Sequence, residues 1–135
     1  MLNPFPLFLN YPLFGPTLLR VVLAAYVIWL GFIKFSPIVM VKTVHFFESM
    51  GFRPGLVYAK LLGVGEIVIG FLLLIGLLTQ IDSIITLIIS VVALVVSVRH
   101  KEVGLREPGV YIFIIAICIS LLFLGAGFFA ADLPL

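Results

Sequence analysis

The sequence predicts an all-α integral membrane protein, a four-helix bundle with an interfacial amphipathic helix between the first and second membrane spans. Its 135 residues are enough for a single transmembrane domain. Hydrophobic residues make up 64% of the chain and charged residues only 10%, whereas soluble domains average about 45–50% and about 25%. The apolar runs are too long, and alternate too little, for the strands of a membrane barrel. Because backbone polar groups in lipid must pair internally, these runs are expected to be helices.

Four apolar stretches are long enough to cross the hydrocarbon core, which takes about 20 residues at a helical rise of about 1.5 Å per residue. We place the four spans at about residues 17–35, 58–78, 81–98 and 109–130. The segment before the first span is apolar but is interrupted by Pro4, Pro6, Pro12 and Pro16. Such closely spaced prolines predict that this segment is not helical.

The connection between the first two spans predicts a further helix at about residues 37–50. Ser36 can cap it, Pro37 fits its first position and Gly51 fits the residue after its end. Its polar face is expected to carry Lys42, His45 and Ser49, and its apolar face Met40, Val44 and Phe47. Phe46 falls on the polar side, so the amphipathicity is imperfect. We still expect this helix to lie along the membrane surface.

The basic residues predict the orientation in the membrane. Seven of the eight flank the first and third connections, which lie on one side: Lys34, Lys42, Arg53, Lys60, Arg99, Lys101 and Arg106. Only Arg20 lies at the other side. The positive-inside rule therefore places both termini outside the cytoplasm, in a multi-pass protein of the plasma or inner membrane. The scattered charges form no basic patch, which excludes nucleic acid as a partner.

Each predicted span carries a stripe of small and polar residues, which in lipid allow close helix packing and interhelical hydrogen bonds. In chain order the stripes are Arg20, Ala24, Gly31 and Lys34; Gly63, Glu66 and Gly70; Ser83, Thr86, Ser90, Ala93 and Ser97; and Glu107, Tyr111, Cys118 and Gly125. A stripe on every span favours a bundle of four helices. Simple packing is the alternative role for each stripe, including the serine-rich one.

Glu66 is the strongest candidate for a functional residue. It lies about eight residues, or about 12 Å, into the second span, where a carboxylate is costly unless it is paired or protonated. Its candidate partners are Lys34, then Arg99 and His100 at the end of the third span. A structural ion pair and a functional site are both open interpretations. In the functional one, Glu66 faces a polar pocket opened by the glycines of its span and rimmed by Lys34, Tyr26 and the end of the third span.

The other chemically active side chains provide no second site. His45 and His100 lie at the predicted interface, whereas a membrane haem needs buried axial histidines. No carboxylate and histidine cluster has metal-ligand spacing, so we expect no metal. Tyr26 and Trp29 could stack on a quinone ring, although membrane aromatics more often pack or line the interface. A quinone is therefore the one candidate cofactor.

Several short motifs follow one another along the chain. They are Arg20 through Gly31 to Lys34, Gly51-Phe52-Arg53-Pro54, Gly65-Glu66 with Gly70, the run Leu73-Leu74-Ile75-Gly76-Leu77-Leu78-Thr79, Glu107, and Gly125-x-Gly127 with Asp132. Their order and spacing, over about residues 18–132, resemble the DoxX family of small membrane proteins. The serine that this family usually has between the last glycines and the aspartate is absent.

The resemblance implies a four-helix membrane bundle and supports the fold better than the chemistry. Some DoxX proteins are subunits of thiosulfate:quinone oxidoreductases, and others join membrane assemblies with soluble redox enzymes. The resemblance therefore implies an accessory subunit of a quinone-linked redox system that lies in the lipid bilayer. Its partner would be a soluble or membrane oxidoreductase. A small proton-coupled transporter using Glu66 and a structural or assembly factor are the alternatives. Whether the chain is an enzyme, and whether it forms a homo-oligomer, stay open.

Overall fold

The computed structural model of the chain describes residues 14–99, 107–125, 127 and 131. Those residues form helices joined by turns and contain no strand, which confirms the all-α prediction for the described part of the chain. The helices are α2 (Phe14–Ile33), α3 (Pro37–Ser49), α4 (Gly55–Ile75), α5 (Thr79–Arg99) and α6 (Pro108–Leu124).

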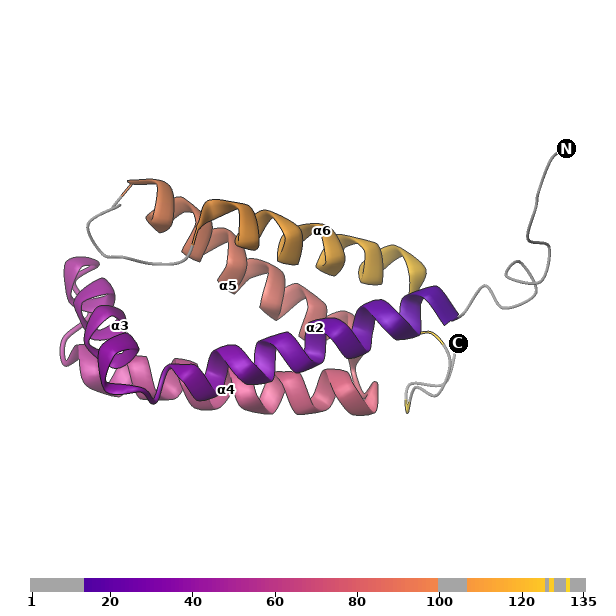
Figure 1. Cartoon of the computed structure of the whole chain (residues 1–135), viewed down its shortest axis with the longest axis horizontal. Helices are drawn as coiled ribbons and strands as arrows, with labels where there is room; N and C mark the ends of the chain where they lie inside the picture. Colours follow the sequence, from indigo (N-terminus) through magenta and orange to yellow (C-terminus); the bar gives the residue numbers. More distant parts are fainter. Residues whose placement is uncertain (1–13, 100–106, 126, 128–130, 132–135) are drawn as a thin grey trace, which may run out of the picture.

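Two antiparallel helix pairs, α2 with α4 and α5 with α6, form the body of the molecule (Figure 1). The pairs approach each other at the end where the turn of residues 76–78 joins α4 to α5, and they diverge toward the other end. α3 lies across the wider end and packs against α4. The molecule therefore has a narrow end and a wide end, and the wide end is covered by α3.

The helix bounds differ from the expected spans at several ends. α2 begins at Phe14, so Pro16 lies in its first turn, where a missing backbone N–H breaks no helical hydrogen bond. α4 and α5 each begin two or three residues before the expected spans at 58–78 and 81–98. α6 ends at Leu124, within the expected span 109–130. The expected end of that span lies partly outside the described residues.

α2 and α4 are held together by glycines that allow their backbones to touch. A Cβ atom added at Gly31 would lie 2.8 Å from the carbonyl oxygen of Gly63, and one added at Gly70 would lie 3.0 Å from the backbone nitrogen of Ile28. Gly63 and Gly70 are both buried on α4. These contacts leave no room for a side chain, as expected for small-residue interfaces between membrane helices.

A left-handed glycine ends α4 and starts the short turn to α5. Gly76 has φ 74° and its N–H donates to the carbonyls of Leu72 and Leu73 at 2.9 and 3.1 Å. Glycine adopts this conformation without a steric penalty. The turn places α5 antiparallel to α4.

α3 is present where the sequence predicts a helix. Ser36 is its N-cap residue and Pro37 its first residue, although the Ser36 side chain makes no capping hydrogen bond. The predicted faces are partly wrong. Phe46 and Thr43 are the buried residues of α3, so Phe46 faces inward and not toward the polar side. The exposed face is mixed, because the apolar Ile38 and Val41 are as open as the polar residues: Lys42, His45 and Ser49.

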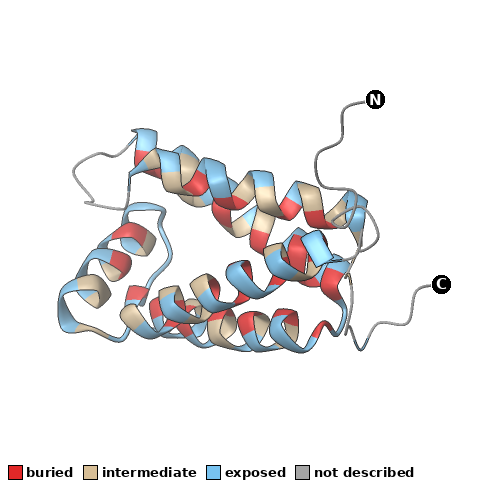
Figure 2. Cartoon of the chain, turned by 45° about the vertical axis from the view of Figure 1, so that its right-hand side comes forward, coloured by how far each residue is buried: buried red, intermediate tan, exposed pale blue. Residues whose placement is uncertain are grey.

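Buried residues lie between the helix pairs, and apolar side chains cover the outside (Figure 2). The main core joins residues of α2, α4 and α6: Leu23, Ala24, Val27, Leu73, Tyr111, Ile114, Cys118 and Leu121. Outward side chains such as Leu61 (63% exposed) and Phe113 (74% exposed) suit a lipid surface. Three helices, α2, α4 and α5, are long and apolar enough to cross a membrane, and α6 is a shorter apolar helix of 17 residues.

Candidate functional site

Lys34 and Glu66 form an ion pair between α2 and α4, as the sequence predicts for its first candidate partner. The Lys34 ammonium donates to both carboxylate oxygens of Glu66. The side chains are 16% and 7% exposed, respectively. Charge-assisted contacts to both oxygens satisfy a carboxylate that would otherwise be costly inside an apolar helix pair.

The glycine contact between α2 and α4 sets the position of this pair. Gly31 packs against the backbone of Gly63 and Ile67. Lys34 lies one turn beyond Gly31, in the turn that follows α2 at the wide end, so its side chain must turn inward to reach Glu66. The close approach of the two backbones keeps that distance within the reach of a lysine.

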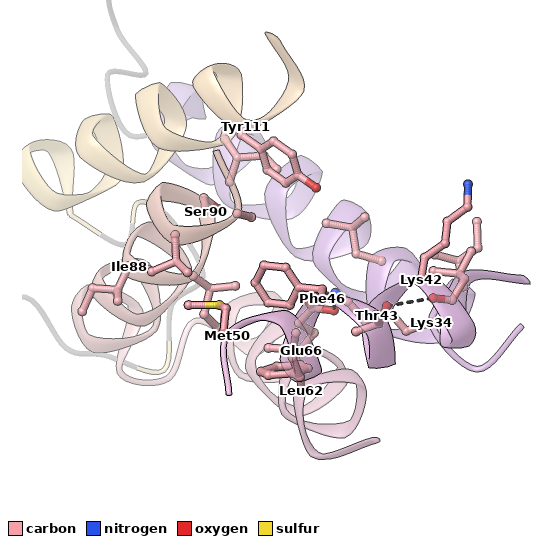
Figure 3. Close-up of a pocket in the computed structure, with 18 of the residues that line it drawn as sticks. Lys34, Lys42, Thr43, Phe46, Met50, Leu62, Glu66, Ile88, Ser90 and Tyr111 are labelled. Carbon is pink, nitrogen blue, oxygen red and sulfur yellow. Dashed lines mark hydrogen bonds and ion pairs between the residues drawn. The ribbon is translucent and has the colours of Figure 1, made fainter. Parts of the chain in front are cut away.

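A cavity of about 450 Å³ lies next to the ion pair, between the diverging helix pairs. Its volume is within the range of about 300–1,000 Å³ found for small-molecule sites. All five helices contribute to its wall, which is mostly apolar. Figure 3 shows Phe46 of α3, Met50 at the C-cap of α3, Ile88 of α5 and Leu62 of α4 around it. The polar side chains on the wall are Lys34, Lys42, Thr43, Glu66, Ser90 and Tyr111.

α3 covers the cavity with its inward face. The Phe46 ring is 8% exposed and projects into the space toward α5 (Figure 3). The Thr43 hydroxyl donates to the carbonyl of Val39 at 2.8 Å, so it is engaged with its own helix. The Lys42 side chain points away from the cavity (Figure 3). Lys34 is therefore the ammonium group that faces the interior of the site.

An aromatic cluster holds α3 against the start of α4. The rings of Phe47 and Tyr58 are 5.9 Å apart, and both contact Phe52, at 6.3 and 5.3 Å. A Cβ atom at Gly55 would lie only 2.7 Å from the carbonyl oxygen of Val44. Ring pairs at these distances add to the apolar burial, and the glycine lets the two helices touch.

The other predicted site residues lie away from the ion pair. Arg20 on α2 is buried, at 2% exposure, but it is 14 residues before Lys34, which follows the end of that helix, about 21 Å at helical rise. Tyr26 is half-buried, with its ring 5.7 Å from that of Trp29. Arg99 and Glu107 are exposed at the ends of α5 and α6. Tyr26, Arg99 and Glu107 do not line the cavity, and His100 lies outside the described residues.

The pocket is not opened by the glycines of the second span, which corrects the expectation from the sequence. Gly63 and Gly70 face α2, where they close the helix contact. The space next to Glu66 comes instead from the divergence of α4 and α5 under α3. The result is a mostly apolar cavity with one charged edge, not a polar pocket.

A second buried polar group near the narrow end was missed by sequence reasoning. Asp82 is 3% exposed and Thr79 is 1% exposed, both in the first turn of α5. The serine-rich stripe continues from them toward the cavity. In the sequence, Asp82 and Thr79 lie beside Ser83 and Thr86, which are one turn apart on one helix face. This position is the feature that could have indicated their burial.

The DoxX family model matches residues 15–99 of the chain. The chain belongs to the DoxX family. The matched range covers α2 to α5 almost completely, and it includes Lys34, Glu66 and the helix that covers the cavity. With its apolar helices, this DoxX chain is a multi-pass membrane protein.

No curated protein and no solved structure matches this DoxX chain. Within the described part of the chain, no group of three histidine, cysteine or acidic side chains could hold a metal ion. The features that bear on the role of this DoxX protein are therefore its cavity and its ion pair.

Proposed function

We propose that this DoxX protein is an accessory subunit of a quinone-linked redox system and holds a quinone head group in its cavity. The observation that carries the proposal is the Lys34–Glu66 ion pair at the edge of a mostly apolar cavity of about 450 Å³. A quinone has an apolar ring and carbonyl oxygens that accept hydrogen bonds, and it supplies two-electron redox chemistry when bound.

The side chains present fit such a ligand. Phe46, Met50 and Ile88 offer apolar and polarisable surface to a ring. Lys34 offers an ammonium donor and Glu66 a carboxylate that can exchange a proton. A few polar groups in an apolar cavity are the general arrangement of a small-molecule site.

A photoreactive quinone analogue tests the proposal. Irradiation of the purified protein with the analogue should label peptides of α3 and α5 that line the cavity, and unmodified quinone should compete. Glu66→Gln keeps the shape but removes the charge, so it should weaken competition by about tenfold, the loss of one charge-assisted contact. Glu48→Gln, on the exposed part of α3, is the matched control. Labelling that ignores competitor would refute quinone binding, and full competition in Glu66→Gln would refute the role of the Glu66 charge in it.

We also propose that α6 is a fourth span and that α3 lies along the membrane surface. α6 packs against α5 for most of its length, and its apolar surface cannot face water. The basic residues around α3 and after α5 support cytoplasmic placement of the wide end, with both termini outside, in the plasma or inner membrane. Cysteines placed at Lys42 and Lys101 should resist membrane-impermeant reagents in intact cells. Labelling at both positions would show that the orientation is inverted.

A structural or assembly role is the second candidate, because the ion pair is buried between the two most closely packed helices. A proton-coupled transporter would have to separate Lys34 from both oxygens of Glu66 in every cycle. Recovery of an oxidoreductase with the protein from native membranes supports the redox role. Uptake driven by a pH gradient and lost in Glu66→Gln supports transport, and loss of accumulation alone supports assembly. Cross-linking in the same membranes also tests for a homo-oligomer.

A further inference from the structure

The inner face of α5 carries buried hydroxyls that the cavity does not explain. Ser83 is 0% exposed and Thr86 is 5% exposed. The hydroxyl oxygens of both residues are buried and have no hydrogen-bond partner among the described residues. Ser90, one turn beyond Thr86, lines the cavity (Figure 3). A row of hydroxyls therefore leads through the interior to the cavity wall.

Hydroxyls elsewhere in the molecule behave differently. Thr43, Ser49 and Ser120 each donate to a carbonyl of their own helix, at 2.8, 2.7 and 2.9 Å. This local bond is the usual way in which a serine or threonine is satisfied inside a helix. Ser83 and Thr86 do not make it, so their hydroxyls are available to another group on the inner face of α5.

Water is the ligand that fits this arrangement. Buried polar groups are nearly always hydrogen-bonded, and where protein partners are lacking an internal water supplies them. The steps from Ser83 to Thr86 and from Thr86 to Ser90 are each about one helical turn, or about 5.4 Å. Two O–H···O bonds of about 2.7–2.8 Å span the same distance. One water molecule therefore has the right length to bridge each step.

We propose that the Ser83 and Thr86 hydroxyls hold a file of internal water molecules along α5, leading from the buried Asp82 to the cavity at Ser90. Asp82 lies one residue before Ser83 and is 3% exposed, so the file begins beside a carboxylate near the narrow end. From Asp82 to Ser90 the file covers about 12 Å at helical rise.

Such a file gives the cavity a route for protons from the end opposite α3. When a proton joins the first water, each O–H bond in the row breaks as the next forms, and a proton leaves the last water at Ser90. The Glu66 carboxylate lies on the same cavity wall and is the nearest acidic side chain on it. No oxidant or reductant takes part, and the water file does not depend on what the cavity binds.

Water-edited solid-state NMR of the labelled full chain in lipid bilayers tests the file. Polarisation from water should reach the side chains of Ser83 and Thr86 at least about threefold faster than those of Ile84 and Ile85. These isoleucines are exposed on the same helix, away from the cavity wall, and are the controls for depth. Ser120 is the control for a hydroxyl, because it is bonded to the Ala116 carbonyl on α6. Transfer to Ser83 and Thr86 as slow as to Ile84 would overturn the proposal.

The variant Thr86→Val keeps the shape of the side chain and removes its hydroxyl. It should slow the transfer from water to the side chain at position 86 to the rate of Ile84, because no hydroxyl remains there to hold a water molecule. Transfer to position 86 as fast as in the unmodified protein would show that the Thr86 hydroxyl holds no water. Thr86→Ser, which retains a hydroxyl, should keep the fast transfer. The measurement on the unmodified protein decides the existence of the waters even if Thr86→Val does not fold.

Discussion

α2 and α5 meet α4 in opposite ways. On one side Gly31, Gly63 and Gly70 bring the backbones of α2 and α4 into contact, with no room for a methyl group at Gly31 or Gly70. On the other side α4 and α5 diverge and leave about 450 Å³ under α3. The same helix therefore supports a closed contact and an open one. The difference shows that residue size along each face decides where a small membrane bundle can hold a ligand.

The largest loss of stability is expected at the boundary of the two regions, where Lys34 meets Glu66. Lys34→Met removes the cation and leaves a carboxylate whose side chain is 7% exposed. The free energy of unfolding should fall by about 3–5 kcal/mol, the cost of breaking a buried pair. Glu66→Gln should cost less, because it leaves the lysine, which is more exposed. Unfolding by denaturing detergent, followed by circular dichroism, measures both variants.

The double variant Lys34→Met/Glu66→Gln is the control for the unpaired charge. It should recover part of the stability lost in Lys34→Met, since no buried carboxylate remains uncompensated. A double variant less stable than both single variants would show that the pair does not act as a unit.

The closed contact should be sensitive to one methyl group. Gly31→Ala places a Cβ atom 2.8 Å from the Gly63 carbonyl oxygen and 3.0 Å from the Ile67 nitrogen. Backbone cannot yield as a flexible side chain can, so α2 and α4 must separate, at a cost of about 1–3 kcal/mol. Gly65→Ala on α4 is the matched control, because nothing lies within 4 Å of its new Cβ atom. Equal thermal stability of the two variants in detergent would mean that the contact is not tight.

The open contact should tolerate added volume. Ala93 lies on the cavity wall, and Ala93→Leu adds three carbon atoms that can extend into free space. We expect the free energy of unfolding to change by less than about 1 kcal/mol, although this variant adds more atoms than Gly31→Ala does. The same variant should reduce labelling by the quinone analogue. A loss of stability as large as that of Gly31→Ala would show that the cavity cannot accept a side chain.

The ion pair and the helical class could be predicted from the sequence because each depends on local rules. Long apolar runs must be helical in lipid. A carboxylate in such a run needs a cation, and Lys34 is on the same helix stripe as Gly31. These arguments need only helical periodicity and charge.

The wall of the cavity could not be predicted in the same way. The inward position of Phe46 depends on how α3 crosses the wide end, and the sequence pattern of a short helix with a mixed exposed face does not determine that crossing. Asp82 lies within the expected span at 81–98, but the sequence pattern alone does not show that its side chain is buried in the first turn of α5. Tyr26 is half-buried away from the cavity, because α2 turns that side chain toward Trp29.

The ion pair also has a consequence for biosynthesis. Lys34 and Glu66 are separated by 32 residues, and α3 is made between them. The lysine therefore leaves the ribosome before the matching carboxylate does. We expect the lysine to stay at the membrane surface during this interval and to move inward when α4 arrives. Release of α2 into lipid and docking of α4 should then be coupled, with the first half of the chain reaching its final depth only after residue 66 has left the ribosome.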